Sequence, residues 1–497
     1  MFVFDFNFAA ARNRQSDLHH RSSLDYAATV SLGISSIIMS TKKPLLSALK
    51  QTMIQDVPAY ANKFIYSLGF LSMISFTILL VTGVVMAAFG PDWWLTSGLG
   101  KYSRSVHLWA TQAFVLFIIL HLLIVFFSSG FKKPRRLTWV IGVIMSIFVL
   151  AEAEFGYVLR GDFSGQWRGL QGADFYNGTG LGRWINSINY RQIYGVHVVV
   201  IPLIIIGLLF LHYLRVRFLG IAKPYKKDVH VPTVKANHKV LFARGGVLVV
   251  LILILAIALP SPFLEPNTIK SVATNDPKLV GQTLLSEFDH SSDTATYLDS
   301  IDPYTYDTRD IYVTQPYNQL VSLTRSSNLL QTYNKESQTR QAAELKQAKD
   351  YFDNIYPGKV DSNNGLEQVI SSLINLSSTG LYQPSLNSAS PTGDQTTYAL
   401  RFLADTGVMD SRAEALGITT DQYGMLREEK GHIPPGAWWL APIGLLNHTV
   451  LAHDDNGDRD GAIILGMLLL LIMALPYIPG LNRIPEWLKV YKLIWRS

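Results

Sequence analysis

Six long apolar runs, separated by polar segments, set the pattern of the chain. A helix needs about 17 to 25 mostly apolar residues to cross a bilayer core. Six stretches approach or reach that length, and the fifth is the shortest. They are Phe64–Phe89, Val106–Phe127, Trp139–Leu159, Val196–Val216, Gly245–Leu259 and Gly461–Ile478. The pattern predicts an all-α membrane protein whose transmembrane bundle has about six spans.

A long polar stretch separates the fifth run from the sixth. Pro260–Asp460 is rich in Asn, Asp, Ser, Thr and Tyr, and Ser337–Tyr356 has the pattern of a strong helix. We therefore expect an inserted, mostly helical domain. The predicted divisions are an N-terminal segment (1–56), a four-helix core (57–228), the fifth helix with its lead-in (229–262), the inserted domain (263–458), and the sixth helix with its tail (459–497). Residues 1–38 lack a signal-peptide layout, and Met39 is an alternative native start.

Composition and charge agree with a membrane protein and predict its orientation. The 497 residues are 48% hydrophobic and only 16% charged, which is unusual for a soluble protein of this size. Basic clusters follow the second, fourth and sixth runs, at Gly130–Arg136, at Arg215–Asp228 and in the C-terminal tail. Lys and Arg favour the cytoplasmic side of a membrane. Both termini are therefore expected in the cytoplasm and the inserted domain outside it. The lipid bilayer is an expected partner, and nucleic acid is not.

The absence of cysteine restricts the chemistry. With no Cys in the chain, disulfides, iron–sulfur ligation and thioether-linked haem are all excluded.

Four histidines lie inside the apolar runs as two matched pairs. His107 and His121 are fourteen residues apart in the second run, and His197 and His212 are fifteen apart in the fourth. On a helix, fourteen residues fall about 40° short of four full turns and fifteen overshoot by about 60°. Each pair therefore shares one helix face, with its members about 21–22 Å apart along the axis. Since the two spans run in the same direction, His107 can face His197 and His121 can face His212.

Three readings of these histidines differ in what they require. A zinc site needs three or four close ligands, whereas these histidines come in twos. A single intramembrane histidine can also bond to a backbone carbonyl or line a polar cavity, although such residues are usually functional. Two imidazoles on opposite sides of a flat macrocycle suit haem iron. The matched pairs favour two stacked bis-histidine haem sites, and a transporter with haem-free histidines is the weakest alternative.

From about Val57 to Asp228, and more weakly over the last two spans, the sequence resembles the cytochrome b and cytochrome b6 family. The segments "RSVHLW" and "GFKKPRRLTWVIGV" and the His197–His212 spacing carry the resemblance. It implies His107 and His197 as ligands of an outer haem, and His121 and His212 as ligands of an inner haem. It also implies that Arg104 meets a haem propionate.

Paired glycines fit the same reading. Gly69 with Gly83, and Gly142 with Gly156, repeat the fourteen-residue spacing of the first histidine pair. Glycine lets a flat ring approach a helix backbone closely, although each glycine alone is equally well explained by helix packing.

The departures from the family affect the quinone sites. Ser67 replaces the cysteine that tethers an additional haem in cytochrome b6, so both haems are expected to be noncovalent haem b. Arg160 and Gly161 replace a Pro-Trp pair, and Arg191 lies six residues before the third ligand instead of five.

The quinol-oxidation motif Pro-Glu-Trp-Tyr also departs from the family. Its nearest counterpart is Gly436–Trp439, "GAWW", in which Ala437 replaces the acid. The literal "PEW" at Pro485–Trp487 falls on the cytoplasmic side, where we read it as an interfacial anchor. Trp438, Trp439 and Asp162 are the candidate outer-site residues. Candidate proton acceptors are Asp162, Glu265, Glu428 and Glu429, with no choice among them.

The resemblance implies the dihaem subunit of a respiratory quinol oxidoreductase of the cytochrome bc type, in the plasma membrane of a prokaryote. Quinol would be oxidised outside and quinone reduced inside. The implied partners are a Rieske-type iron–sulfur protein, a cytochrome c or similar acceptor, and a second copy in a homodimer within a larger complex. The alternative is a dihaem electron conduit or membrane anchor that links an extracytoplasmic redox partner to the quinone pool. The missing outer glutamate and the inserted domain favour this alternative.

Overall fold

The computed structural model describes residues 56–222, 232–300, 307–386, 395–419, 436–454 and 457–494. The chain divides into two compact units, Met1–Asp56 and Val57–Ser497. Apart from Asp56, the first unit lies outside the described residues, and so do the predictions for residues 1–38 and Met39. The architecture below is that of the second unit.

Within the described residues, six helical segments are long and apolar enough to cross a membrane, as the sequence predicted. The second, third and fifth spans are the single helices α5 (Gly98–Phe127), α6 (Arg136–Val158) and α10 (His238–Ala258). The first span, Phe64–Phe89, consists of the 3-10 turn η2 (Phe64–Ser67) and α3 (Leu68–Phe89), and the sixth, Arg459–Tyr477, consists of most of α22 (Gly457–Ala474) and the 3-10 turn η10 (Leu475–Tyr477). The fourth span, Tyr190–Leu219, consists of α8 (Tyr190–Gly195), the π-helix η3 (Val196–Val200) and α9 (Ile201–Leu219). The fifth span begins seven residues before its apolar run, because Asn237 caps α10 by accepting a hydrogen bond from the Val240 N–H. The all-α bundle is confirmed.

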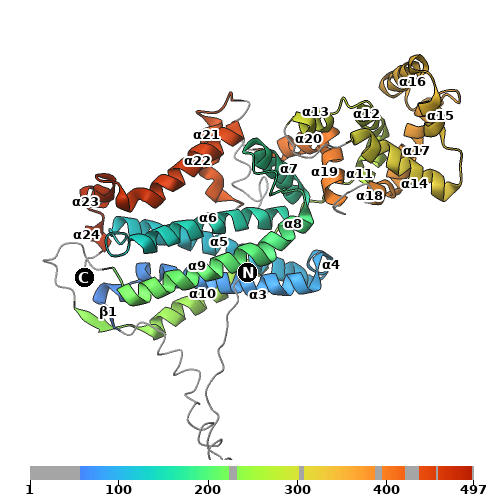
Figure 1. Ribbon diagram of the computed structural model, residues 1–497. Coiled ribbons are helices and arrows are strands. Elements are labelled where there is room, and N and C mark those ends of the chain that lie inside the picture. The colour runs from blue at the N-terminus through green and yellow to red at the C-terminus, as the bar shows by residue number, and fades with distance from the viewer. Residues whose placement is uncertain are drawn as a thin grey trace, which may run out of the picture. The chain divides into compact units, whose positions relative to one another are not determined.

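The four-helix core consists of two helix pairs. α3 packs along α5, and α6 packs along α9 (Figure 1). α10 packs against α3 and α5, where Leu248, Ile252 and Ala256 are buried with Leu71 and Ala110. α22 packs against α6, and the Trp139 indole donates a hydrogen bond to the Ile472 carbonyl at 2.8 Å. The fifth and sixth spans thus lie against different pairs of the core.

Short elements connect the spans. The strands β1 (Asp56–Pro58) and β2 (Thr233–Lys235) form a two-stranded sheet beside the lead-in to α10. The remaining connecting elements are η1 (Ala59–Asn62), α4 (Pro91–Thr96), α7 (Phe163–Gly178), η9 (Trp438–Leu440), α21 (Ala441–His448), η11 (Leu481–Arg483), α23 (Ile484–Leu488) and α24 (Tyr491–Ile494).

The inserted stretch is helical, and its helices bury apolar side chains that include Tyr312, Phe352, Leu373 and Phe402. Its elements are α11 (Ile269–Asn275), α12 (Pro277–Phe288), α13 (Asp293–Ser300), η4 (Asp310–Thr314), α14 (Gln315–Thr324), α15 (Leu329–Lys335), α16 (Gln338–Asp350), η5 (Tyr351–Ile355), α17 (Gly365–Thr379), α18 (Tyr382–Ser385), α19 (Gln395–Asp405) and α20 (Val408–Leu416). The helix predicted over Ser337–Tyr356 is present as α16 followed by η5, and Ser337 caps it.

Helix α7 connects the bundle with the inserted helices. Phe163 and Trp167 are buried in the core that the inserted helices form. The Gln166 side chain and the Asn267 backbone exchange two hydrogen bonds of 2.8 Å. The segment after the third span is therefore packed with the inserted residues.

Candidate functional site

The four intramembrane histidines face one another in two pairs, as the sequence predicted. His107 and His121 come from α5, His197 from η3 and His212 from α9. The ring centroids of His107 and His197 are 6.4 Å apart, and those of His121 and His212 are 6.5 Å apart. Imidazole nitrogens bind a first-row metal at about 2 Å, so two rings that share one metal have centres roughly 6 Å apart. Both pairs therefore fit a bis-histidine metal site.

A π-helical turn corrects the predicted phase of the second histidine pair. The Ile201 N–H donates to the Val196 carbonyl, five residues back, and Pro202 follows without an N–H of its own. The turn accommodates one additional residue. The side chains after it therefore keep their direction around the helix axis, whereas in a regular α-helix that residue would rotate them by roughly 100°. The expected 60° overshoot between His197 and His212 is thereby removed, and their phase matches that of His107 and His121.

Each predicted glycine lies against one of these histidines. A Cβ atom on Gly156 would lie 3.0 Å from Cε1 of His197, and one on Gly83 would lie 3.5 Å from Cε1 of His107. At the other pair, the distances are 3.3 Å from Gly69 to His121 and 3.4 Å from Gly142 to His212. Glycine therefore leaves room beside all four rings, and each histidine pair has one glycine from α3 and one from α6.

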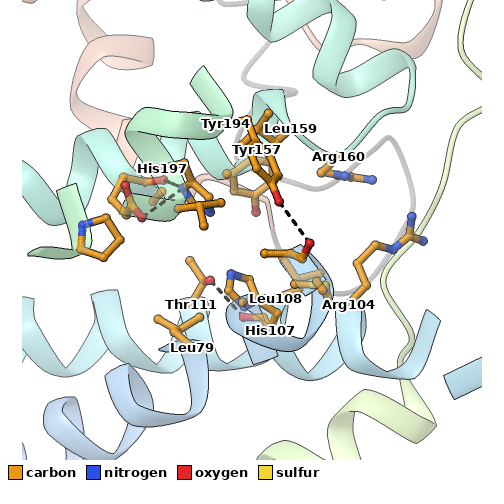
Figure 2. A pocket seen from close by; sticks show the side chains of 18 of the residues that line it. Leu79, Arg104, His107, Leu108, Thr111, Tyr157, Leu159, Arg160, Tyr194 and His197 are labelled. Carbon is orange, nitrogen blue, oxygen red and sulfur yellow. Dashed lines mark hydrogen bonds and ion pairs between the residues drawn. The ribbon is translucent and has the colours of Figure 1, made fainter. Parts of the chain in front are cut away.

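A cavity of about 540 Å³ contains the His107 and His197 pair (Figure 2). Its walls are mostly apolar side chains from α3, α5, α6 and α9, and Gly83 and Gly156 also line it. Arg104, Arg160 and Arg191 are among its polar lining residues. An apolar cavity with a few basic groups suits a flat, apolar macrocycle that carries carboxylates.

Hydrogen bonds fix the outer histidine rings through Nδ1. Nδ1 of His107 lies 2.8 Å from the Thr82 hydroxyl, and Nδ1 of His197 lies 3.1 Å from the Glu152 carbonyl. Metal-binding histidines usually bond in this way through the nitrogen that does not hold the metal. Nε2 of each ring is thus left for a ligand in the cavity.

The donor set fits haem better than a protein-ligated metal ion. Over the described ranges, no group of three or more His, Asp or Glu side chains is placed to hold an ion. The paired imidazoles, the glycine gaps and the apolar cavity together fit a haem with two axial histidines.

Arg104, the expected propionate partner, lines the cavity on α5. Its guanidinium donates to the Ser261 carbonyl at 3.2 Å and lies 5.3 Å from the centre of the Phe263 ring. Arg160 donates to the carboxylate of Asp162 at 2.5 Å and to the Pro262 carbonyl at 2.7 Å. The segment after α10 therefore contacts the guanidinium groups of both arginines.

The candidate outer-site residues Asp162, Trp438 and Trp439 do not line this cavity. Asp162 is fully buried, pairs with Arg160 and accepts a hydrogen bond from the Gly165 N–H as the cap of α7. The Trp438 indole donates to the Gln112 side chain at 2.7 Å, and the Trp439 indole donates to Glu154 at 2.9 Å. Each of the three residues thus makes packing and hydrogen-bond contacts next to the cavity.

Sequence reasoning missed two acidic residues on α6. Glu152 lines the cavity, and its Oε1 lies 3.1 Å from Nδ1 of His197. Glu154 contacts Trp439 and also accepts a hydrogen bond from Arg168 at 3.3 Å. Two glutamates inside an apolar run were the available signal, because intramembrane acids are usually functional.

Three other acids, besides Asp162, were candidate proton acceptors. Glu265 does not line the cavity, while Glu428 and Glu429 lie outside the described residues.

Two further predictions concern the end of the bundle where α5 ends and α6 begins. Ser67, which replaces the haem-tethering cysteine of cytochrome b6, accepts a hydrogen bond from Arg244 at 2.6 Å. Glu486 of the literal "PEW" segment pairs with Lys132 and Arg483, and Trp487 is exposed. The segment therefore lies beside the basic loop Gly130–Arg136, which follows the C-terminal end of α5, whereas Arg104 lies near the N-terminal end of that helix.

Comparisons with known proteins place these features in a family. The family described as "Cytochrome b(N-terminal)/b6/petB" matches residues 112–272. Cytochrome b6 of Heliobacterium modesticaldum is 32% identical over 190 residues, covering 34% of this chain and 89% of that protein. Cytochrome b6 of Synechocystis is 33% identical over 190 residues, with 34% and 85% covered.

One solved structure, titled "Hyperthermophilic respiratory Complex III", has a TM-score of 0.39 at 15% identity and covers 75% of this chain and 95% of its own. A score at that level adds nothing to the assignment, which rests on the sequence matches. The chain belongs to the cytochrome b and cytochrome b6 family.

Proposed function

We propose that this chain is the dihaem cytochrome b subunit of a respiratory quinol oxidoreductase of the cytochrome bc type. The two histidine pairs, with centroid separations of 6.4 and 6.5 Å, carry the proposal. His107 and His197 would hold the outer haem b, and His121 and His212 the inner one. Bound haem b supplies one-electron chemistry by alternating between ferric and ferrous iron.

The surrounding residues would bind and orient these groups. Thr82 and the Glu152 carbonyl hold the outer imidazoles through Nδ1, so that Nε2 points into the cavity. Four glycines leave space beside the histidine rings: Gly69, Gly83, Gly142 and Gly156. Arg104 would pair with a propionate. With no cysteine in the chain, both haems would be noncovalent, and a Rieske-type iron–sulfur centre would belong to another subunit.

The proposed orientation follows from the basic loops. The Lys- and Arg-rich segments after the second, fourth and sixth spans would face the cytoplasm of a prokaryotic cell. The His107 and His197 pair would then lie in the outer half of the membrane and the inserted helices outside it. A cytochrome c or similar protein would accept electrons there, and the subunit would work as a homodimer in a larger complex.

A second candidate is a dihaem conduit or anchor that passes electrons between the quinone pool and an extracytoplasmic partner. Two observations favour it. Ala437 is fully buried where the family's motif has an acid, and both neighbouring indoles are already hydrogen-bonded, to Gln112 and to Glu154. In this case, Trp438 and Trp439 would be structural, and quinone chemistry would occur at the inner side only.

Two measurements on the purified membrane complex test these proposals. Acid-acetone extraction followed by a pyridine haemochrome assay should give two extractable haem b per chain. One haem per chain, or a macrocycle left on the protein, contradicts the dihaem proposal. A redox titration with and without an inhibitor of outer quinol oxidation then separates the candidates. Inhibitor-sensitive reduction by quinol supports the reductase, and insensitive reduction supports the conduit.

A further inference from the structure

The two outer histidines have different partners at Nδ1. On α5, Nδ1 of His107 lies 2.8 Å from the hydroxyl of Thr82, which lies 2.7 Å from the Ile78 carbonyl. The single hydroxyl proton of Thr82 goes to that carbonyl, so the hydroxyl accepts the Nδ1 proton of His107. His107 therefore has a neutral partner.

His197 has an acidic partner in addition to a carbonyl. Its Nδ1 lies 3.1 Å from Oε1 of Glu152 and also 3.1 Å from the Glu152 backbone oxygen. The second carboxyl oxygen, Oε2, is buried and accepts no hydrogen bond from any part of the chain that the structure describes. His197 is thus the hydrogen-bond donor that the structure gives to this carboxyl group.

The inner pair has no such partner. Among the described residues, the ion pair between an intramembrane histidine and an acidic side chain is that of His197 with Glu152. The closest glycine neighbours of His121 and His212 are Gly69 and Gly142. The two sites share the same ligand and glycine pattern, and an acidic side chain beside a histidine is found at the outer one. Any effect of Glu152 should therefore be confined to the outer site.

We propose that Glu152 is a positioning residue that tunes the outer haem through His197. This inference rests on the proposed dihaem function. A carboxylate that accepts the Nδ1 proton makes the imidazole a stronger donor through Nε2. A stronger axial donor stabilises ferric iron more than ferrous iron, and second-shell hydrogen bonding is one of the means by which a protein sets a haem potential. Glu152 therefore lowers the reduction potential of the outer haem and leaves the inner one unchanged.

The test is a potentiometric titration of the purified complex that carries Glu152→Gln. The amide keeps the size of the side chain but cannot carry a negative charge. Loss of the carboxyl group should favour the reduced outer haem, so its ratio of reduced to oxidised form at a fixed ambient potential should rise roughly tenfold, which corresponds to about 1.4 kcal/mol. The inner haem should titrate as in the wild type, and the low-temperature EPR signal of the outer ferric haem should shift.

Glu154→Gln is the matched control. It removes a carboxyl group two residues along the same helix, where the contacts are Trp439 and Arg168 instead of a histidine. Both haem potentials should stay at their wild-type values in this variant.

A second variant covers the case in which the amide disturbs haem retention. Glu152→Ala removes the carboxyl group and keeps the backbone carbonyl that also faces His197. The proposal is overturned if a variant that retains both haems shows an unchanged outer potential, if the control shifts equally, or if both Glu152 variants lose the outer haem. Wild-type protein without two haems would instead refute the proposed function, and this inference with it.

Discussion

Substitution of Gly156 by alanine should weaken the outer haem site. The added Cβ would lie 3.0 Å from Cε1 of His197. Carbon atoms in contact prefer about 3.5–4.0 Å, so the ring or the helix must yield by about half an ångström. Overpacking of this kind costs about 1–3 kcal/mol. If the whole cost falls on the ligand geometry, the haem affinity of the outer site drops between about five-fold and 150-fold.

The four glycines form a graded series for this experiment. The distance from the added Cβ to the nearest histidine atom rises from 3.0 Å at Gly156 through 3.3 Å at Gly69 and 3.4 Å at Gly142 to 3.5 Å at Gly83. Haem loss should therefore decrease in that order, and Gly83→Ala should be nearly neutral because 3.5 Å is an ordinary contact.

The matched control is Gly207→Ala, on α9 between His197 and His212. A Cβ at that position meets nothing within 4 Å, and alanine improves helix propensity by about 0.8–1 kcal/mol. Haem content per chain by pyridine haemochrome, and the rate of haem transfer to excess apomyoglobin, are the readouts. Wild-type haem retention by Gly156→Ala, or greater loss from Gly83→Ala than from Gly156→Ala, would refute the steric reasoning.

Three further results are expected. The Lys- and Arg-rich exits predict a cytoplasmic C-terminus and an external Pro260–Asp460 stretch. A reporter fused at Ser497 should therefore be active only if it works in the cytoplasm, and protease added to spheroplasts should cut within Pro260–Asp460. Protection of that stretch from protease would reverse the predicted orientation. Trp438→Ala and Trp439→Ala should slow quinol-driven haem reduction while haem content is kept, and wild-type rates in both would favour the conduit. Burial raises the pKa of Glu287, and its hydrogen bond with Asp405 raises it further, so folding of the inserted helices retains a proton that the unfolded chain releases near pH 4–5. Their thermal stability should therefore fall as the pH rises above that range, by at most about 1.4 kcal/mol per pH unit; Glu287→Gln should flatten this dependence in unfolding of the purified chain, and an unchanged slope would contradict it.

The spans and the histidine pairs could be predicted because both follow from helix geometry alone. Long apolar runs have one stable form in a bilayer, since every backbone polar group must be paired internally. A spacing of fourteen residues returns to the same helix face whatever the neighbouring helices do. The glycines could be assigned for the same reason, as they repeat the phase of the histidines.

The hydrogen-bond partners around the outer cavity could not be predicted. Thr82 reaches His107 across twenty-five residues and Glu152 reaches His197 across forty-five, which no local pattern encodes. Trp438 and Trp439 were chosen from a family motif, whereas the acid that lines the cavity, Glu152, comes from another helix. The contacts of α7 with the inserted helices, such as the Gln166–Asn267 pair, likewise depend on tertiary packing.

The π-turn at Val196–Val200 also has an evolutionary consequence. An insertion within a continuous transmembrane helix turns every later side chain by roughly 100°, which would carry His212 out of register with its partner. A turn that bulges around the added residue confines the change to a few positions, so a one-residue insertion or deletion there is neutral for the second histidine. A helix with this turn and a spacing of fifteen can therefore hold the same site as a regular helix with a spacing of fourteen, and a search pattern with a fixed spacing would separate the two.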